Sequence, residues 1–325
     1  MFGVIKGTGM YVPEYVMDNN DIAKFVETSD EWIQERTGVV RRHIISGDTT
    51  VSMAVNAAKN ALDDAGINPC EIDLILVSTI SSNVIMPCVA CEVQKEIGAV
   101  NAVGFDLSAA CSGFVLAYNT ANAYIESGIY KKILIIGSES LSNTVNWNDR
   151  GTCILFGDGA GAVVLEASDE DCYYPVAHSD GRLGNALTLA SRHDNGMFSK
   201  EAKEYENEKY YINMDGQAVF KFAVRKVPEV IVELLDKNGL KKEDIKYYIL
   251  HQANKRIVEA VAKHLNESIE KFPMNLYEYG NTSSASIPIL LDEMNKKYMF
   301  SSGDVIVVAG FGGGLTWGAS VIKWR

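Results

Sequence analysis

Cys111 lies in a stretch of small residues, DLSAACSGF, where a short apolar run ends and a helical pattern begins. An ordinary thiol has a pKa near 8.5 and is only a few per cent ionised at neutral pH, whereas the thiolate is the nucleophile. The unpaired N–H groups and partial positive charge at a helix start should lower the pKa of Cys111 and can hold an oxyanion. The pattern predicts a nucleophilic cysteine, and a buried core cysteine is the alternative.

Two further side chains could assist such a nucleophile. His251 directly follows the apolar run YYIL, a predicted strand, and the sites of α/β proteins gather at the carboxyl edge of their strands. A structural histidine is the alternative. Asn281 lies in GNTSSASIP, a cluster typical of a turn, and its amide could donate to a carbonyl oxygen. The glycines of residues 309–320, AGFGGGLTWGAS, expose backbone N–H groups as an oxyanion cradle requires.

The glycine-rich segments do not fit a nucleotide site. Neither residues 309–320 nor residues 156–165 open a helix as a G-x-G-x-x-G fingerprint does, and the chain has no Gly-Lys for a P-loop. Cys88 and Cys91 form a C-x-x-C pair without two further ligands at matching spacing, so we expect neither a metal nor a redox role. Pro87 predicts the first residue of a helix, which would make the two cysteines core neighbours one turn apart.

Trp32 and Arg36 lie four residues apart in SDEWIQERTGVVRRH, a segment that predicts a helix. Residues at this spacing share one helical face. An aromatic plane beside a guanidinium could sandwich a nucleobase. A solvated amphipathic helix is the alternative.

The elements that must position these residues occur twice along the chain. Residues 62–77 and 235–250 align without a gap at an offset of 173, and each apolar helical pattern ends at a glycine, Gly66 or Gly239, before an apolar strand. Residues 108–128 match 283–303 with a two-residue slip, and two later strand pairs follow in the same order. Helices alternating with continuous apolar strands predict an α/β fold with buried sheets, duplicated at a seam near residues 168–173.

Composition limits the partners. Of 325 residues, 47% are hydrophobic and 22% charged, and the formal net charge is -12, which excludes nucleic acid or an anionic membrane as a partner. No signal peptide or span of 18 apolar residues is found, and six cysteines are too few for a disulfide scaffold. We expect a cytoplasmic protein in which the polar residues 199–211 form a surface loop.

Several long motifs occur in a characteristic order: GTGMYVPE, TSDEWIQERTGVVRRHI, AACSGF, DRGTCILFGDGAGA, HQAN, GNTSSASIP and GFGGGLTWG. Together they resemble β-ketoacyl-acyl carrier protein synthase III, a condensing enzyme of the thiolase superfamily. The resemblance implies a thiolase-like five-layered αβαβα fold of two duplicated halves, which we divide as 1–170 and 171–325. It also implies a homodimer that condenses an acyl-CoA with malonyl-acyl carrier protein. The products are 3-oxoacyl-carrier protein, CoA and carbon dioxide, and no cofactor is needed because the CoA thioester is itself a substrate.

The resemblance also assigns site residues. It implies that Cys111 is the nucleophile, that His251 and Asn281 complete the catalytic set, and that the N–H groups of Cys111 and Gly313 form an oxyanion hole. The implied CoA-binding residues are Trp32, Arg36, Arg150 and Asn254. The implied acyl pocket comprises Leu141, Phe156 and the partner subunit's Met86. Met86 replaces an aromatic ring found in other members, and its flexible thioether leaves room for a longer or branched starter.

The expected carrier protein is itself acidic, so the chain must meet it with a local basic patch rather than by overall attraction. Helical spacings of four and of seven to eight residues give the candidates: Lys221, Arg225, Lys255, Arg256 and Lys263.

Three alternatives remain open at this stage. A related enzyme of secondary metabolism would share every catalytic residue and differ in pocket and acceptor. A papain-type Cys-His-Asn hydrolase would release free acid without malonyl groups. A non-catalytic paralogue is the third, and the intact Cys111, His251 and Asn281 argue against it.

Overall fold

Two sheets form the frame of the computed structural model, which describes residues 1–169, 172–191 and 210–324. The first sheet has the strand order β1 (Phe2–Tyr11), β7 (Gly159–Ser168), β6 (Lys132–Glu139), β4 (Leu74–Ser78) and β5 (Val103–Leu107). The second has the order β8 (Val176–Ser179), β13 (Thr316–Lys323), β12 (Val305–Gly312) and β11 (Ile245–Leu250). Residues 199–209 of the predicted surface loop lie outside the described residues.

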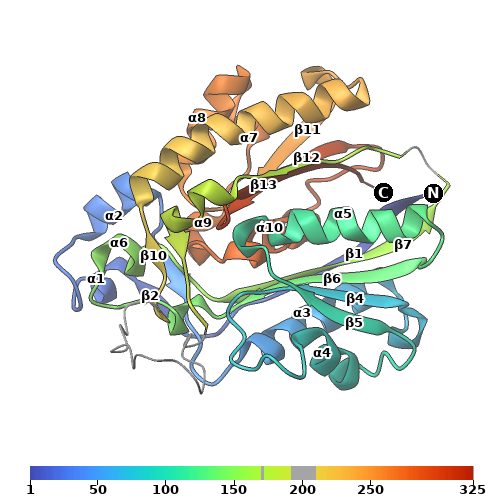
Figure 1. Cartoon of the computed structure of the whole chain (residues 1–325), viewed down its shortest axis with the longest axis horizontal. Coiled ribbons are helices and arrows are strands. Elements are labelled where there is room, and N and C mark those ends of the chain that lie inside the picture. The colour runs from blue at the N-terminus through green and yellow to red at the C-terminus, as the bar shows by residue number, and fades with distance from the viewer. Residues whose placement is uncertain (170–171, 192–209, 325) are drawn as a thin grey trace, which may run out of the picture.

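Helices make three layers around these sheets, and Figure 1 shows the order from α7 and α8 through the two sheets to α3 and α4. The outer helices are α3 (Thr50–Ala65) and α4 (Val89–Ile97) on the first sheet, and α7 (Gly216–Asn238) and α8 (Lys255–Leu265) on the second. The central layer consists of α5 (Gly113–Glu126) and α10 (Ser286–Lys296). The predicted five-layered α/β fold is confirmed.

Shorter elements flank the layers. They are β2 (Val16–Asp18), α1 (Asn19–Ile22), α2 (Asp30–Thr37), β3 (Arg41–His43), α6 (Arg150–Cys153), β9 (Leu187–Thr188), β10 (Asn213–Met214) and α9 (Leu276–Tyr279). Two single 3₁₀ turns, η2 (Ala110–Ser112) and η8 (Ser283–Ala285), lead directly into the central helices α5 and α10.

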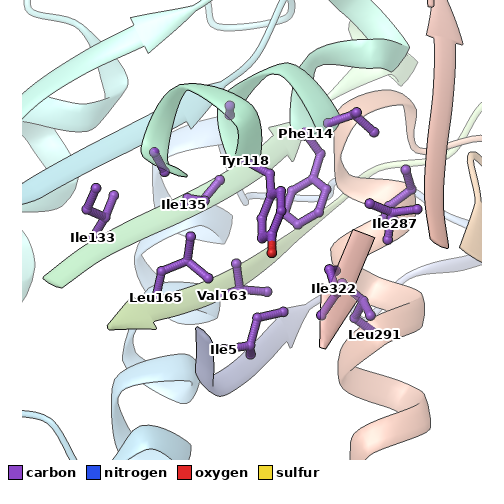
Figure 2. Close-up of a cluster of buried hydrophobic side chains, with 14 of the residues drawn as sticks. Ile5, Phe114, Tyr118, Ile133, Ile135, Val163, Leu165, Ile287, Leu291 and Ile322 are labelled. Carbon is purple, nitrogen blue, oxygen red and sulfur yellow. The ribbon is translucent and has the colours of Figure 1, made fainter. Parts of the chain in front are cut away.

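The central helices are buried by both sheets at once. Phe114 and Tyr118 of α5 and Leu291 of α10 are almost fully buried in one cluster with Val163 of the first sheet and Ile322 of the second. Figure 2 shows the α5 side chains reaching into this cluster. Burying each such side chain stabilises the fold by about 1.5–3 kcal/mol, so the two sheets are held together through their shared helices.

The duplication is visible in the sheets as well as in the sequence. β4 and β6 are parallel, β6 and β7 antiparallel, and β7 and β1 antiparallel; β11, β12, β13 and β8 repeat this pattern in the same order. The helices α3 and α7 both end at the expected glycine, with φ of 63° at Gly66 and at Gly239. That left-handed geometry costs glycine nothing.

The predicted two-residue slip between the halves is wrong. η2 and η8, the starts of α5 and α10, and the strands β6 and β12 all keep the offset of 173 residues. Even the backbone repeats, because Ala110 and Ser283 have φ of 46° and 49° at the start of their turns. Similar small residues in the two segments favoured an alignment with the slip. The positions of the two turns show instead that the halves align without it.

The predicted start of α4 at Pro87 is also wrong. The helix begins at Val89 with Cys88 as its N-cap residue. Cys91 is exposed and Cys88 half-buried, with their sulfur atoms 3.4 Å apart, so they are not core neighbours. The first N–H groups of α4, those of Val89 and Ala90, donate to the carboxylate of Asp106 in β5 at 2.8 Å, and this contact, which the proline alone could not indicate, fixes where the helix begins.

Candidate active site

Cys111 sits in η2, immediately before α5, and only 8% of its surface is exposed. It lines two adjoining cavities, a larger one of about 620 Å³ and a smaller one of about 90 Å³. The described residues therefore place a thiol between two spaces of different size.

The expectation that the helix start lowers the pKa of Cys111 is not confirmed. Burial raises the pKa of the thiol to about 12, and the negative charge of Glu139 adds to the effect. Loss of hydration disfavours the thiolate more than the helix start favours it. The resting group is thus a thiol that must lose its proton as it attacks.

His251 follows β11 as predicted, and its imidazole lies in the wall of the smaller cavity. Its Nδ1 is 2.7 Å from the hydroxyl of Ser286, which also accepts a bond from the Gln252 N–H at 3.4 Å. The hydroxyl can thus donate its proton to Nδ1, and this network assigns the remaining proton to Nε2. Burial lowers the pKa of His251 to about 3, so the ring is neutral at physiological pH.

Asn281 lies in the wall of the same cavity and is 6% exposed. Its Oδ1 accepts a hydrogen bond of 2.8 Å from the Ser283 N–H. Its backbone is bonded on both sides to the segment that carries Phe156, at Leu155 and Gly157. With the oxygen engaged, the amide N–H groups are the atoms left to act as donors. The structure thus brings Cys111, His251 and Asn281 around one cavity.

The glycine-rich segment packs against the cysteine. A Cβ on Gly312 would lie 2.7 Å from the backbone nitrogen of Cys111, so the approach requires glycine here. Gly313, the predicted oxyanion residue, lines the larger cavity together with Cys111.

The four predicted CoA-binding residues form one cluster beside the smaller cavity. The guanidinium groups of Arg36 and Arg150 lie 5.9 and 4.9 Å from the ring centre of Trp32. Asn254, the N-cap residue of α8, lines the smaller cavity and donates a bond of 3.0 Å to the Arg36 carbonyl. The cluster thus joins α2, α6 and α8 at the edge of the site.

The predicted acyl-pocket residues are divided. Leu141 and Phe156 line the larger cavity with Cys111. Met86 is 88% exposed and does not line either cavity of its own chain as the described residues define them. A contribution of this side chain to a pocket therefore requires a second subunit.

The five predicted carrier-binding residues are exposed on α7 and α8, two outer helices that pack against each other. Arg225 pairs with Glu229 at 3.0 Å and Lys255 with Glu259 at 3.6 Å, which reduces their effective charge. Arg256 lies over the Phe220 ring at 5.3 Å, near the start of α8 and the Trp32 cluster.

Comparison with known proteins identifies the family. Two models described as 3-oxoacyl-[acyl-carrier-protein] synthase III, one of them for its C-terminal part, match residues 105–181 and 235–324. The chain is 49% identical to a β-ketoacyl-[acyl-carrier-protein] synthase III of Clostridium acetobutylicum over 98% of both proteins. This chain belongs to the β-ketoacyl-acyl carrier protein synthase III family. The predicted enzyme class, a condensing acyltransferase, is confirmed.

Solved structures agree with this family assignment. The synthase III of Aquifex aeolicus is 44% identical, with a TM-score of 0.92, covering 99% of this chain and 100% of the other. The priming β-ketosynthase of a polyketide pathway is 33% identical, with a TM-score of 0.94, covering 100% and 96%. The synthase III fold therefore accompanies more than one biosynthetic role.

Two residues of this synthase III chain that bear on the site were missed. Ser286 hydrogen-bonds His251, and no pattern in SSASIP distinguishes it from its neighbours. Glu139 is fully buried near Cys111. It is the one charged residue among ILIIGSES, and a charge at the end of an apolar strand was a signal that could have revealed it.

Proposed function

We propose that Cys111, His251 and Asn281 carry the decarboxylative condensation of an acyl-CoA with malonyl-acyl carrier protein. The observation that supports this most is the shared cavity, which a cysteine from the first half and two hydrogen-bond donors from the second half line together. Condensation needs both kinds of group, because one carbon centre is attacked while charge develops on a second carbonyl.

In the first half-reaction, the Cys111 sulfur bonds to the acyl carbon and the bond from that carbon to the CoA sulfur breaks. The proton of the thiol leaves with CoA, since the thiol is protonated at rest. The N–H groups of Cys111 and Gly313 stabilise the oxyanion of this step. Leu141 and Phe156 bound the space that receives the acyl chain, which the larger cavity next to Cys111 provides.

In the second half-reaction, the malonyl group loses carbon dioxide and leaves an enolate on the carrier-bound thioester. The neutral His251 donates from Nε2 and Asn281 donates from its amide to that oxygen. The carbanion attacks the acyl-Cys111 carbonyl and the cysteine sulfur departs as a thiolate, which takes up a proton from solvent to restore the resting thiol. Neither half-reaction needs an external oxidant or reductant, so the proposal requires no redox cofactor.

Trp32, Arg36, Arg150 and Asn254 bind the nucleotide end of CoA. Stacking of a base on an aromatic ring contributes about 1–3 kcal/mol. We expect Trp32→Ala to raise the KM for acyl-CoA about tenfold. The KM for an acyl-pantetheine substrate without the nucleotide should stay at the wild-type value, with Tyr174→Ala, which removes an exposed aromatic ring that contacts Lys237 outside this cluster, as the control. An equal rise for the truncated substrate would contradict the assignment.

The acidic carrier protein binds to a basic surface on α7 and α8 that comprises Lys221, Arg225, Lys255, Arg256 and Lys263. Arg256→Glu should raise the KM for malonyl-carrier protein several-fold, because it reverses a charge beside the site entrance without weakening the start of α8, where an acidic residue is favourable. Acylation by acyl-CoA should not change. Lys59→Glu, an exposed charge reversal on α3 in the opposite layer, is the control. Unchanged carrier kinetics would remove Arg256 from the docking surface.

A homodimer fits the exposed surface next to β5, the last strand of the first sheet in the described chain. Val103 at its start is 50% exposed, and Ile85 and Met86 before α4 are 59% and 88% exposed. An open strand edge beside exposed apolar side chains favours association. In this arrangement the partner subunit's Met86 completes the acyl pocket.

Within one chain, the two duplicated halves divide between residues 170 and 171.

The location proposed for the protein is the cytoplasm, where acyl-CoA and carrier protein meet. Within the described residues, no helix is long and apolar enough to span a membrane. The described residues also contain no group of three His, Cys, Asp or Glu side chains that could hold a metal ion.

Supplying the starter unit of a secondary metabolite is the second candidate, favoured by the similarity to a priming β-ketosynthase of a polyketide pathway. It would use the same residues and differ in the acyl group accepted. Primary fatty-acid initiation is favoured because several Clostridium relatives with 46–49% identity are β-ketoacyl-acyl carrier protein synthases III.

The mass of the intact protein after incubation with a panel of acyl-CoAs tests the proposal. We expect one acyl adduct on the wild type and none on Cys111→Ala, and the preferred acyl group identifies the starter. Addition of malonyl-carrier protein should discharge the adduct and produce 3-oxoacyl-carrier protein. Discharge to the free acid without that product would instead indicate a hydrolase.

A further inference from the structure

Glu139, the last residue of β6, is a carboxylate with no exposed surface. It accepts hydrogen bonds from the Ser284 hydroxyl at 2.8 Å and, on its other oxygen, from the Ser81 hydroxyl at 2.5 Å and the Ile80 N–H at 3.1 Å. The donors are all neutral. Burial raises the pKa of this carboxyl, because ionising a buried group is costly even when it is hydrogen-bonded, and Glu139 ends a strand next to the nucleophile.

The duplication gives this position a counterpart. Glu139 and Gly312 are the last residues of β6 and β12 and lie 173 residues apart, as do Cys111 and Ser284. Gly312 abuts the backbone of Cys111 in η2, and Glu139 bonds to Ser284 in η8. The strand end of each half therefore supports the turn of the other half. The first contact holds the nucleophile, and the second holds the turn next to Asn281.

The turn that Glu139 supports needs an external restraint. Ser283, its first residue, has a φ of 49°, which is unfavourable for a residue with a side chain. The N–H of the same residue donates to Oδ1 of Asn281. The Ser284 hydroxyl lies within hydrogen-bond distance of two acceptors, the Glu139 carboxyl at 2.8 Å and the Ser78 carbonyl at 2.9 Å, and its single proton is shared between them. If this turn moved, the hydrogen bond from the Ser283 N–H to the Asn281 amide oxygen would break. That bond keeps the amide oxygen away from the cavity and leaves the amide N–H groups facing it.

The same carboxylate acts on the nucleophile. Its charge contributes to the raised pKa of Cys111. Ser283 lies close to both groups and lines the larger cavity, and its buried hydroxyl has no hydrogen-bond partner among the described residues. Within the described residues, Glu139 at the end of β6 and His251 after β11 are the titratable groups that border the thiol.

We propose that Glu139 is a positioning residue of the condensing site: it holds the Ser283–Ala285 turn, and through this turn it holds the Asn281 amide in place. This inference rests on the proposed role of Asn281. We expect loss of the Glu139 carboxylate to slow the malonyl half-reaction more than acyl transfer, because the turn supports Asn281, the proposed donor to the enolate.

Two variants test the charge and the length of this side chain separately. Glu139→Gln removes the charge and keeps the length, and Glu139→Asp keeps the charge and shortens the side chain. Three quantities are measured: acylation by acyl-CoA, decarboxylation of a malonyl thioester, and the pH profile of Cys111 alkylation by iodoacetamide. Glu139→Gln should slow decarboxylation about tenfold, since small displacements of a catalytic group cost this much or more, while acylation changes about threefold or less. Its alkylation profile should move to lower pH, because a neutral neighbour no longer opposes the thiolate.

Glu139→Asp keeps the charge but withdraws it by one methylene. It should slow decarboxylation while leaving the alkylation profile at the wild-type pH, and it keeps the test available where Glu139→Gln does not fold. Asp292→Asn is the matched control, because Asp292 is an equally buried and hydrogen-bonded carboxylate on α10 that does not bond to η8. It should leave both the rate ratio and the alkylation profile unchanged.

Asn281→Ala, measured in parallel, distinguishes the two levels of the argument. If Asn281→Ala decarboxylates normally, the proposed function of Asn281 fails. If it is slow while both Glu139 variants keep the wild-type ratio of decarboxylation to acylation and the wild-type alkylation profile, the inference about Glu139 alone is overturned. An equal effect of Asp292→Asn would also overturn it, since general destabilisation would then explain the result.

Discussion

Asn281→Ala is expected to slow condensation about 10²–10³-fold while acyl transfer to Cys111 continues at close to the wild-type rate. Losing one preorganised donor to an oxyanion typically costs about 2.7–4 kcal/mol. The amide N–H groups of Asn281 face the smaller cavity because Ser283 occupies its oxygen. The donor is needed only when charge develops on the malonyl thioester, so the first half-reaction does not use it.

Asn281→Asp sharpens this test. Aspartate keeps an oxygen that can accept from the Ser283 N–H, so the turn stays fastened, but it removes the donor and opposes the enolate charge. We expect a loss at least as large as for alanine, at unchanged thermal stability. Rapid-quench measurement of acyl-enzyme formation and of carbon dioxide release separates the half-reactions. Equal losses in both would contradict the assignment.

Gly312→Ala is expected to damage both half-reactions together. The added methyl carbon would lie 2.7 Å from the Cys111 nitrogen and 3.1 Å from the Ser112 nitrogen, and neither backbone atom can rotate away. η2 must therefore shift, moving the thiol and the N–H of Cys111 at the same time. A displacement of about 1 Å at reacting atoms costs about 10²-fold, and acylation is the first step to show it.

Gly181→Ala is the matched control for this variant. No atom lies within 4 Å of the position where its Cβ would stand, and its backbone is not left-handed. It should acylate at the wild-type rate. If Gly312→Ala also acylated normally, the contact between the glycine-rich segment and Cys111 would have no part in positioning the nucleophile. The contrast with Asn281→Ala is therefore diagnostic, since one variant affects a single step and the other affects both.

Local pattern predicted much of the fold and the site. Apolar periodicity and the glycines at positions 66 and 239 were enough to predict the repeat, because helix ends and buried strands depend on nearby residues. The convergence of Cys111, His251 and Asn281 followed from their places after strands and in turns, together with the family resemblance. These features are encoded locally, and each half encodes them in the same way.

What the sequence did not predict depends on how the halves dock. The pKa of Cys111 is raised because two sheets and their helices enclose it, and no single segment reports that burial. The role of Glu139 depends on Ser284, a residue 145 positions away in the other half. α4 starts at Val89, where its first N–H groups donate to Asp106 of β5, and the proline before the helix does not reveal this contact. Enclosure and long-range contacts of this kind are set by tertiary packing.

The reciprocal support of η2 by β12 and of η8 by β6 has a consequence for the life of the chain in the cell. Neither half can present a competent nucleophile or a competent donor alone, so activity begins only when both have folded and closed on each other. We therefore expect no acylation of a chain that is still being synthesised or whose halves have separated.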